Sequence, residues 1–151
     1  MDKKYTDTEV GNLRGMELDL QLAMGLIERA KSAASETGVP VIIAVVDPAT
    51  NLKAFSRMDG AVLGSIDIAI RKAKTAALFE CNSEDVWEYC KPGAPAHGLE
   101  LSNGGLAPFA GGIAIKDPNG KLLGAVGVSG GSVNQDQAIA KATVAGISFN
   151  S

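Results

Sequence analysis

Apolar residues recur at three- and four-residue intervals in three segments of the chain, and this spacing predicts helices. The segments are residues 15–37, residues 66–78 and about residues 133–146. A shorter helix is predicted over residues 82–89, because Asn82 is a typical N-cap residue and acidic residues follow it. The remaining apolar segments of the chain lie between the first and second of these helices and before the last one.

The second helix, with Ser65 as its expected N-cap, carries mostly alanine on the face predicted to be buried. Such small side chains would let the helix lie close to a sheet. Lys72 falls outside the predicted stripe and is expected to be solvated or to lie at a subunit contact. The buried faces of the first and last helices are predicted to include Leu20, Met24 and Ala142.

Four other segments are predicted to be strands, because they are short, apolar and bounded by turn residues. Residues 39–46 form a nearly continuous β-branched run, so both faces of this strand should be covered. Residues 52–57 alternate apolar and polar and are predicted to form a hairpin with residues 39–46. Residues 112–116 are predicted to form a second hairpin with the glycine-spaced run after Gly120. The turns of both hairpins carry Asp-Pro. The order of elements predicts an α/β protein with one antiparallel sheet of four or five strands and helices packed on it.

The fourth strand and the corner after it are rich in glycine. Gly124 and Gly127 place no side chain on the strand, so another part of the chain should pack closely against its backbone. Gly130 and Gly131 leave backbone amides near a helix start, where an anionic group could bind; the alternative is a tight turn that needs positive φ. Asp136 is expected to cap the following helix or to interact with its dipole.

Composition narrows the class of protein. The chain has 151 residues, about one domain, with residues 1–14 predicted to be a flexible segment and residues 15–151 a single domain. The net charge of −3 and the lack of any basic run of five or more residues argue against a nucleic-acid partner.

The sequence also predicts the compartment. No apolar run approaches the ~18 residues of a membrane span, and no secretory signal is recognisable, so a cytoplasmic protein is expected. Cys81 and Cys90 are expected to be free thiols, with a disulfide as the alternative. A single histidine makes a zinc site of Cys and His ligands implausible.

Five short motifs follow one another along almost the whole chain. They are Val45-Val46-Asp47, Arg57-Met58-Asp59-Gly60-Ala61, Ala69-x-x-Lys72-Ala73-x-Thr75-Ala76, Gly111-Gly112, and Gly124-x-x-Gly127-Val128-Ser129-Gly130-Gly131 with Asp136. In this order they resemble the GlcG/HbpS family, which includes the C-terminal domain of PduO-type corrinoid adenosyltransferase. The resemblance spans about residues 13–147, and the ordered set is specific although no single motif is.

The resemblance implies a profilin-like or PAS-like sandwich that assembles into dimers and often octamers. It also implies binding of haem or a related tetrapyrrole in some members and of iron in the extracellular ones, but no single reaction. The chain departs from the family at the first turn, residues 48–51, where relatives carry Gly-Gly or a similar pair. It also has no His in the first helix, so a histidine ligand there cannot be carried over, and only His97 is available.

Candidate ligand-binding residues lie at the end of the second strand and on the loop over residues 91–112. Arg57 could clamp a carboxylate or a haem propionate, or could pair with Asp59 to fix the corner. Met58 could be a soft axial ligand, although packing is the simpler interpretation. Lys72 could add positive charge for an anionic ligand.

The loop is too long for a simple connection, and loops of this length are often functional. His97 could ligate haem iron or move a proton near neutral pH, or it could be a structural surface residue. Asn103 and Gly104 could donate to a ligand oxygen or could only shape the loop. Trp87 and Tyr89, on the adjacent short helix, could stack on a planar ligand or form core or subunit contacts.

Three functional hypotheses follow. The first is a small-molecule binding protein for haem or a related planar anionic ligand, with no other cofactor expected. The alternative is a cofactor-free lyase or isomerase acting on a small carboxylated, possibly aromatic, substrate, in which Arg57 and Asn103 hold the substrate and His97 or Asp59 moves the proton. The third is a homo-oligomeric accessory subunit of a catabolic pathway.

Overall fold

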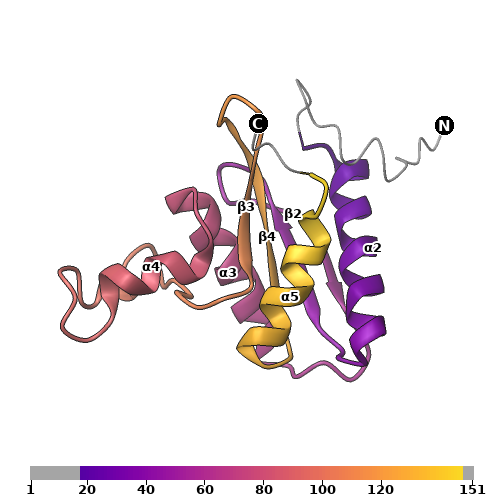
Figure 1. Cartoon of the computed structure of the whole chain (residues 1–151), viewed down its shortest axis with the longest axis horizontal. Helices are drawn as coiled ribbons and strands as arrows, with labels where there is room; N and C mark the ends of the chain where they lie inside the picture. The colour runs from indigo at the N-terminus through magenta and orange to yellow at the C-terminus, as the bar shows by residue number, and fades with distance from the viewer. Residues whose placement is uncertain (1–17, 148–151) are drawn as a thin grey trace.

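A four-stranded antiparallel sheet lies at the centre of the structure, a computed structural model that describes residues 18–147 (Figure 1). Its strands follow the order β2-β1-β4-β3. They are β1 (Ile42–Val46), β2 (Leu52–Arg57), β3 (Gly112–Lys116) and β4 (Leu122–Ser129). The expected α/β fold with one antiparallel sheet is confirmed, whereas the predicted flexible segment at residues 1–14 lies outside the described residues.

Helices cover both faces of the sheet. They are α2 (Leu20–Thr37), α3 (Ser65–Phe79), α4 (Ser83–Cys90), α5 (Val133–Val144) and the 3-10 turn η1 (Leu99–Leu101). α2 and α5 pack on one face and α3 on the other, so each face has its own apolar core. α4 and the loop after it project sideways from this body (Figure 1), and we call residues 80–105 the α4 arm.

Strand β1 is buried on both faces, as its β-branched sequence predicts. Ile43 and Val45 contribute to the core under α2 and α5, and Ile42 and Ala44 contribute to the core under α3. The strand can do this because β2 and β4 pair with its two edges. β1 is therefore the strand from which both layers are built.

The two hairpins use the same turn. Asp47 Oδ1 accepts hydrogen bonds of 2.9 Å from the amides of Ala49 and Asn51. Asp117 Oδ1 accepts 2.8 and 2.9 Å bonds from the amides two and four residues further on. The carboxylate thus closes each turn from inside, which explains why both turns begin with aspartate.

Some helix predictions were wrong in detail. α2 begins at Leu20, after the N-cap Asp19, so residues 18 and 19 are not helical although the prediction included them in the helix. Residues 15–17 of the predicted helix lie outside the described residues. Leu20 and Met24 are 56% and 45% exposed, because the sheet takes the neighbouring stripe that contains Leu22 and Leu26. Ala142 of α5 is also exposed, one residue before the buried Thr143.

The start of α3 also differs from the prediction. Ser65 is its first residue rather than its N-cap, and Gly64 occupies the cap without a side-chain hydrogen bond. The backbone bonds from Ser65 and Ile66 to the preceding turn hold the helix start instead.

Glycine allows α3 and β4 to lie against each other. A β-carbon at Gly127 would overlap the carbonyl oxygen of Ala69, and one at Gly112 would overlap that of Lys72. At Gly124, an added β-carbon would meet the carbonyl oxygen of Val46. The expected close approach to the fourth strand is therefore confirmed at both of its glycines.

None of the helices within residues 18–147 combines the length and the apolar character needed to cross a lipid bilayer.

Replacing Gly127 with alanine should destabilise the fold by about 1–3 kcal/mol or more, because α3 would have to move away from β4. The matched control is Gly64→Ala, since Gly64 has helical backbone angles and open space around it. Urea unfolding of both variants measures the difference. Equal unfolding midpoints would show that the contact is not tight.

Candidate functional site

Lys72 is the largest fully buried side chain among the described residues. It is 1% exposed, and its Nζ donates 2.9 Å hydrogen bonds to the carbonyl of Val128 and to Asp136 Oδ2. The ring of Phe109 lies with its centroid 5.2 Å from the same nitrogen. The prediction that Lys72 is solvated or lies at a subunit contact is therefore wrong.

Asp136 completes this buried pair. It is 3% exposed, and its second oxygen, Oδ1, accepts a 2.8 Å bond from the amide of Gly131. Ser132, with Gln135 in a capping box, is the actual N-cap of α5. Asp136 therefore joins α3, the end of β4 and the first turn of α5. It is not the N-cap, but it lies in the first turn of the helix, where a negative charge interacts favourably with the dipole, the second of the two expected roles.

The environment of Lys72 decides what its amine can do. Burial lowers the pKa of Lys72, whereas the hydrogen bond and charge of Asp136 act in the opposite direction. The amine is enclosed and fully partnered, so it offers no route for a carbonyl substrate that would form a Schiff base. The pair acts as a structural connection between the layers.

The glycine corner is a tight turn with its amides largely in use. Gly130 has φ 144°, and a β-carbon there would lie 2.8 Å from the carbonyl oxygen of Pro40. The Gly131 amide donates to Asp136, and the Ser132 amide donates 2.8 Å to Gln135 Oε1. In this conformation the amides of residues 131 and 132 bond to side chains of α5, the Asp136 carboxylate among them, rather than to a bound ligand.

Arg57 and Met58 lie at the same end of the sheet as this corner. Arg57 and Ser129 pair with Ile42 from its two sides, so β1 alone separates them. The Sδ of Met58 accepts a 3.5 Å hydrogen bond from the Val41 amide, and Met58 packs against the core. The packing interpretation of Met58 is thereby supported.

Arg57 and Asp59 are exposed. An ion pair between them, one of the two roles considered for Arg57, is not among those formed within the part of the chain that the structure describes.

The remaining candidates lie on the α4 arm. His97 is exposed, in a chain of turns whose amides bond to nearby carbonyls. Asn103 has φ 54°, and its carbonyl oxygen accepts from Lys74 Nζ, while Arg71 binds the carbonyl of Gly104. Basic side chains of α3 therefore fix the loop through its carbonyls.

The predicted site residues thus form two groups. Arg57, Met58, Gly130 and Gly131 lie at one end of the sheet, whereas His97 and Asn103–Gly104 lie on the arm. Figure 1 shows the arm and β2 toward opposite ends of the long axis of the molecule. One protomer therefore does not bring His97 against Asp59 or Arg57.

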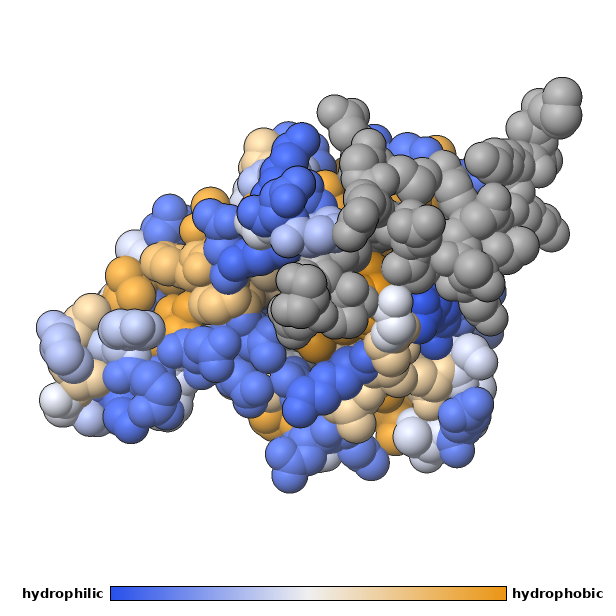
Figure 2. All heavy atoms as spheres, turned by 45° about the horizontal axis from the view of Figure 1, so that its top comes forward, coloured by the Kyte–Doolittle hydropathy of each residue, from blue (hydrophilic) through white to orange (hydrophobic). Residues whose placement is uncertain are grey.

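An apolar pocket of about 420 Å³ lies along the arm, between the end of α3, one side of α4 and the turns that follow. We call it the apolar arm pocket, and its lining residues are Phe79, Cys81, Asp85, Val86, Tyr89, Ala96 and Leu99. Figure 2 shows hydrophobic side chains gathered over this part of the molecule. His97 lies in sequence between two of the lining residues, Ala96 and Leu99.

The cysteines near this pocket are free thiols, as expected. Burial raises the pKa of Cys81, the charge of Asp85 adds to this effect and that of Lys116 opposes it, so the thiol is protonated near neutral pH. Within residues 18–147, no three His, Cys, Asp or Glu side chains come together as a metal site of protein ligands would require.

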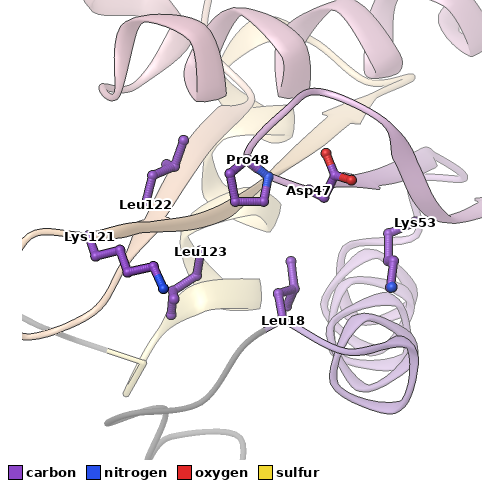
Figure 3. A pocket seen from close by; sticks show the side chains of 7 residues that line it. All are labelled: Leu18, Asp47, Pro48, Lys53, Lys121, Leu122 and Leu123. Carbon is purple, nitrogen blue, oxygen red and sulfur yellow. The ribbon is translucent and has the colours of Figure 1, made fainter.

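Another cavity, of about 290 Å³, lies between the two hairpin turns. Figure 3 shows Lys53 and Lys121 on opposite sides of it, with Leu18 and Leu123 between them. None of the site residues predicted from the sequence lines this cavity.

Comparison with known proteins identifies relatives of the whole described fold. The family model for "Haem degrading protein HbpS-like" matches residues 18–145. The chain is 38% identical over 125 residues to an uncharacterised 15.0 kDa protein of the dhaT-dhaS intergenic region of Citrobacter freundii, a match that covers 82% of this chain and 87% of that protein. It is also 38% identical over 133 residues to the corrinoid adenosyltransferase PduO of Citrobacter freundii.

The PduO match covers 87% of this chain but 39% of PduO, so the chain corresponds to less than half of that enzyme. Among solved structures, a PduOC:heme complex superposes with a TM-score of 0.79 and 35% identity, over 83% of this chain and 91% of that one. These matches confirm the resemblance that the ordered motifs predicted.

Disrupting the buried pair from one side should be costly. Lys72→Met leaves the Asp136 carboxylate buried, and Asp136→Leu leaves the lysine buried without its counter-charge, so each should lose about 3–5 kcal/mol of unfolding free energy. The double variant should lose clearly less than the sum. Denaturant unfolding of the three variants measures this, and additive losses would show that the two side chains do not depend on each other.

Proposed function

The chain belongs to the HbpS-like family, and we propose that it binds haem or a related planar, anionic tetrapyrrole. The observation that carries the proposal is the apolar arm pocket, two of whose lining residues, Ala96 and Leu99, flank the single histidine of the chain in the sequence. Its volume of about 420 Å³ is within the usual range of small-molecule sites. The likeness to a haem-bound PduOC structure supports the same ligand class.

The residues of the pocket fit a tetrapyrrole in three respects. Phe79 and Tyr89 present aromatic rings for the macrocycle to pack against. His97 could supply a neutral imidazole to the iron from the turn between Ala96 and Leu99. Lys116, whose charge acts on the lining residue Cys81, could pair with a propionate.

The residues of this chain would bind and orient the ligand. The apolar lining would exclude water from the macrocycle faces, and backbone hydrogen bonds hold the turns after α4 that carry His97. Haem, when bound, would supply an iron centre able to accept a further ligand. Arg57, at the end of the sheet, remains the alternative clamp for the propionates.

The alternative of a lyase or isomerase receives less support from one protomer. It requires Arg57, Asn103 and His97 around one substrate, and these residues lie in separate parts of the molecule. A second copy would have to complete such a site.

The proposal of a homo-oligomer rests on the side of β2 that faces the layer of α3, where the described residues leave apolar side chains exposed. The core beneath α3 contains no residue of β2, although Ala44 and Val46, which contribute to that core, pair with Phe55 and Leu52. Leu52, Val62 and Leu63 are 50%, 65% and 66% exposed. An edge strand with exposed apolar side chains is typical of a subunit contact.

Titration with haemin, followed in the Soret band, tests the ligand. We expect a saturable shift in the wild type, a changed or weakened shift in His97→Ala, and an unchanged one in Arg57→Ala, because Arg57 is remote from the arm. A flat wild-type titration would remove the tetrapyrrole proposal. Loss of binding in Arg57→Ala alone would move the site to the end of the sheet.

Light scattering after size exclusion tests the assembly. At micromolar concentration we expect the mass of a dimer or a larger homo-oligomer up to an octamer. Leu63→Asp should lower that mass, because it places a charge in the exposed apolar surface. Leu101→Asp is the matched control, since Leu101 is 81% exposed on the arm. A wild-type monomer would contradict the proposal.

A further inference from the structure

A second pocket lies on the arm, on the side of α4 that faces α5. It is an open groove with a volume of about 550 Å³, bordered by α4, residues 108–110 and the first turns of α5. Its lining residues are Glu84, Asp85, Trp87, Glu88, Pro108, Phe109, Ala110, Val133, Asn134 and Gln137. We call it the acidic arm pocket, because its lining includes three acidic residues and no basic one.

Local contacts hold these carboxylates in position. Glu84 Oε1 accepts a 3.1 Å bond from Gln137 Nε2, which connects α4 to α5. Asp85 Oδ2 accepts from the Asn82 amide in the capping box of α4. Glu88 pairs at 2.7 Å with Lys91. Two carboxylates are therefore left without a counter-charge among the described residues.

The other charged groups near the pocket do not change this balance. α5 contributes the neutral side chains of Asn134 and Gln137. Asp136 and Lys72, behind the pocket wall, neutralise each other in the buried pair. The pocket therefore presents a net negative charge to a ligand.

Two aromatic rings lie beside the carboxylates. Trp87 is 45% exposed and Phe109 is 38% exposed. The buried ammonium of Lys72 lies 5.2 Å from the Phe109 ring, so the protein already places a cation on the inner side of one ring. The Trp87 ring has no such partner among the described residues and can offer its face to a ligand.

We propose that the acidic arm pocket binds a small organic cation, an ammonium group attached to an apolar body. The carboxylates attract the ammonium, the Trp87 face adds a cation–π contact, and Pro108, Ala110 and Val133 cover the apolar part. This site is distinct from the proposed tetrapyrrole site, which takes an anion; the two pockets adjoin across α4 and share the lining residue Asp85.

Trp87 is the single tryptophan of the chain, so its fluorescence reports directly on this pocket. The probe is benzyltrimethylammonium, compared at equal ionic strength with the neutral benzyl alcohol and the anionic phenylacetate. We expect a saturable fluorescence change with the cation, at a dissociation constant about two- to five-fold lower than that of the neutral analogue, and none with the anion.

Glu84→Gln tests the charge without removing the contact to α5, because an amide oxygen can still accept from Gln137. We expect binding of the cation to weaken about two- to five-fold, while binding of the neutral analogue stays the same. The matched control is Glu36→Gln, an exposed carboxylate on α2 remote from the pocket, which should behave as the wild type.

Three results would overturn the proposal. The first is an equal response to all three probes, and the second is an equal effect of the two glutamate substitutions. The third is a Trp87 fluorescence that changes with protein concentration alone, which would show that a second copy of the chain occupies the pocket.

Discussion

The ion pair between Lys72 and Asp136 is the contact on which the arrangement of the layers depends. It joins residues 64 positions apart in the chain, and it also bonds to Val128 and Gly131. Helix α3 is thereby connected to the end of β4 and to the start of α5, across both cores. Because both groups are shielded from water, either one left alone would retain a buried, unpaired charge, which is far more costly than a broken surface pair.

The glycines around the pair follow from this requirement. A β-carbon at Gly111 would lie 2.7 Å from the Lys72 amine, and β-carbons at Gly112 and Gly127 would overlap the backbone of α3. The helix therefore lies against bare backbone at the centre of the sheet. Ser83 Oγ extends the same connection to the arm, since it donates 2.6 Å to the Phe109 carbonyl and accepts 2.9 Å from the Gly112 amide.

The centre of the molecule is closely packed, and the two proposed ligand sites lie at its periphery, beside α4. The two pockets beside α4 differ in charge, because one side of the helix presents Val86 and Tyr89 and the other presents Glu84 and Glu88. One short amphipathic helix thus offers two different surfaces. Family membership fixes the fold around this arm, while the side chains that line the pockets are those of this chain.

The sequence by itself determined the features that depend on neighbours in the chain. The buried strand β1, the two Asp-Pro turns and the N-cap at Asn82 were all predicted, because each follows from residues a few positions apart. The close approach to Gly124 and Gly127 was also predictable, since a strand glycine already indicates a contact.

Only the tertiary structure decided where the charged and polar candidates lie. Periodicity placed Lys72 outside the buried stripe, because a lysine counts as polar until its partner is known, and Asp136 is distant in sequence. It likewise could not show that His97 lies on the arm while Arg57 lies at the end of the sheet, since the two belong to segments that do not pair. The spacing of residues along the chain specifies helices and strands. Which side chains are buried, and which candidate site residues come together, depends on how those helices and strands pack.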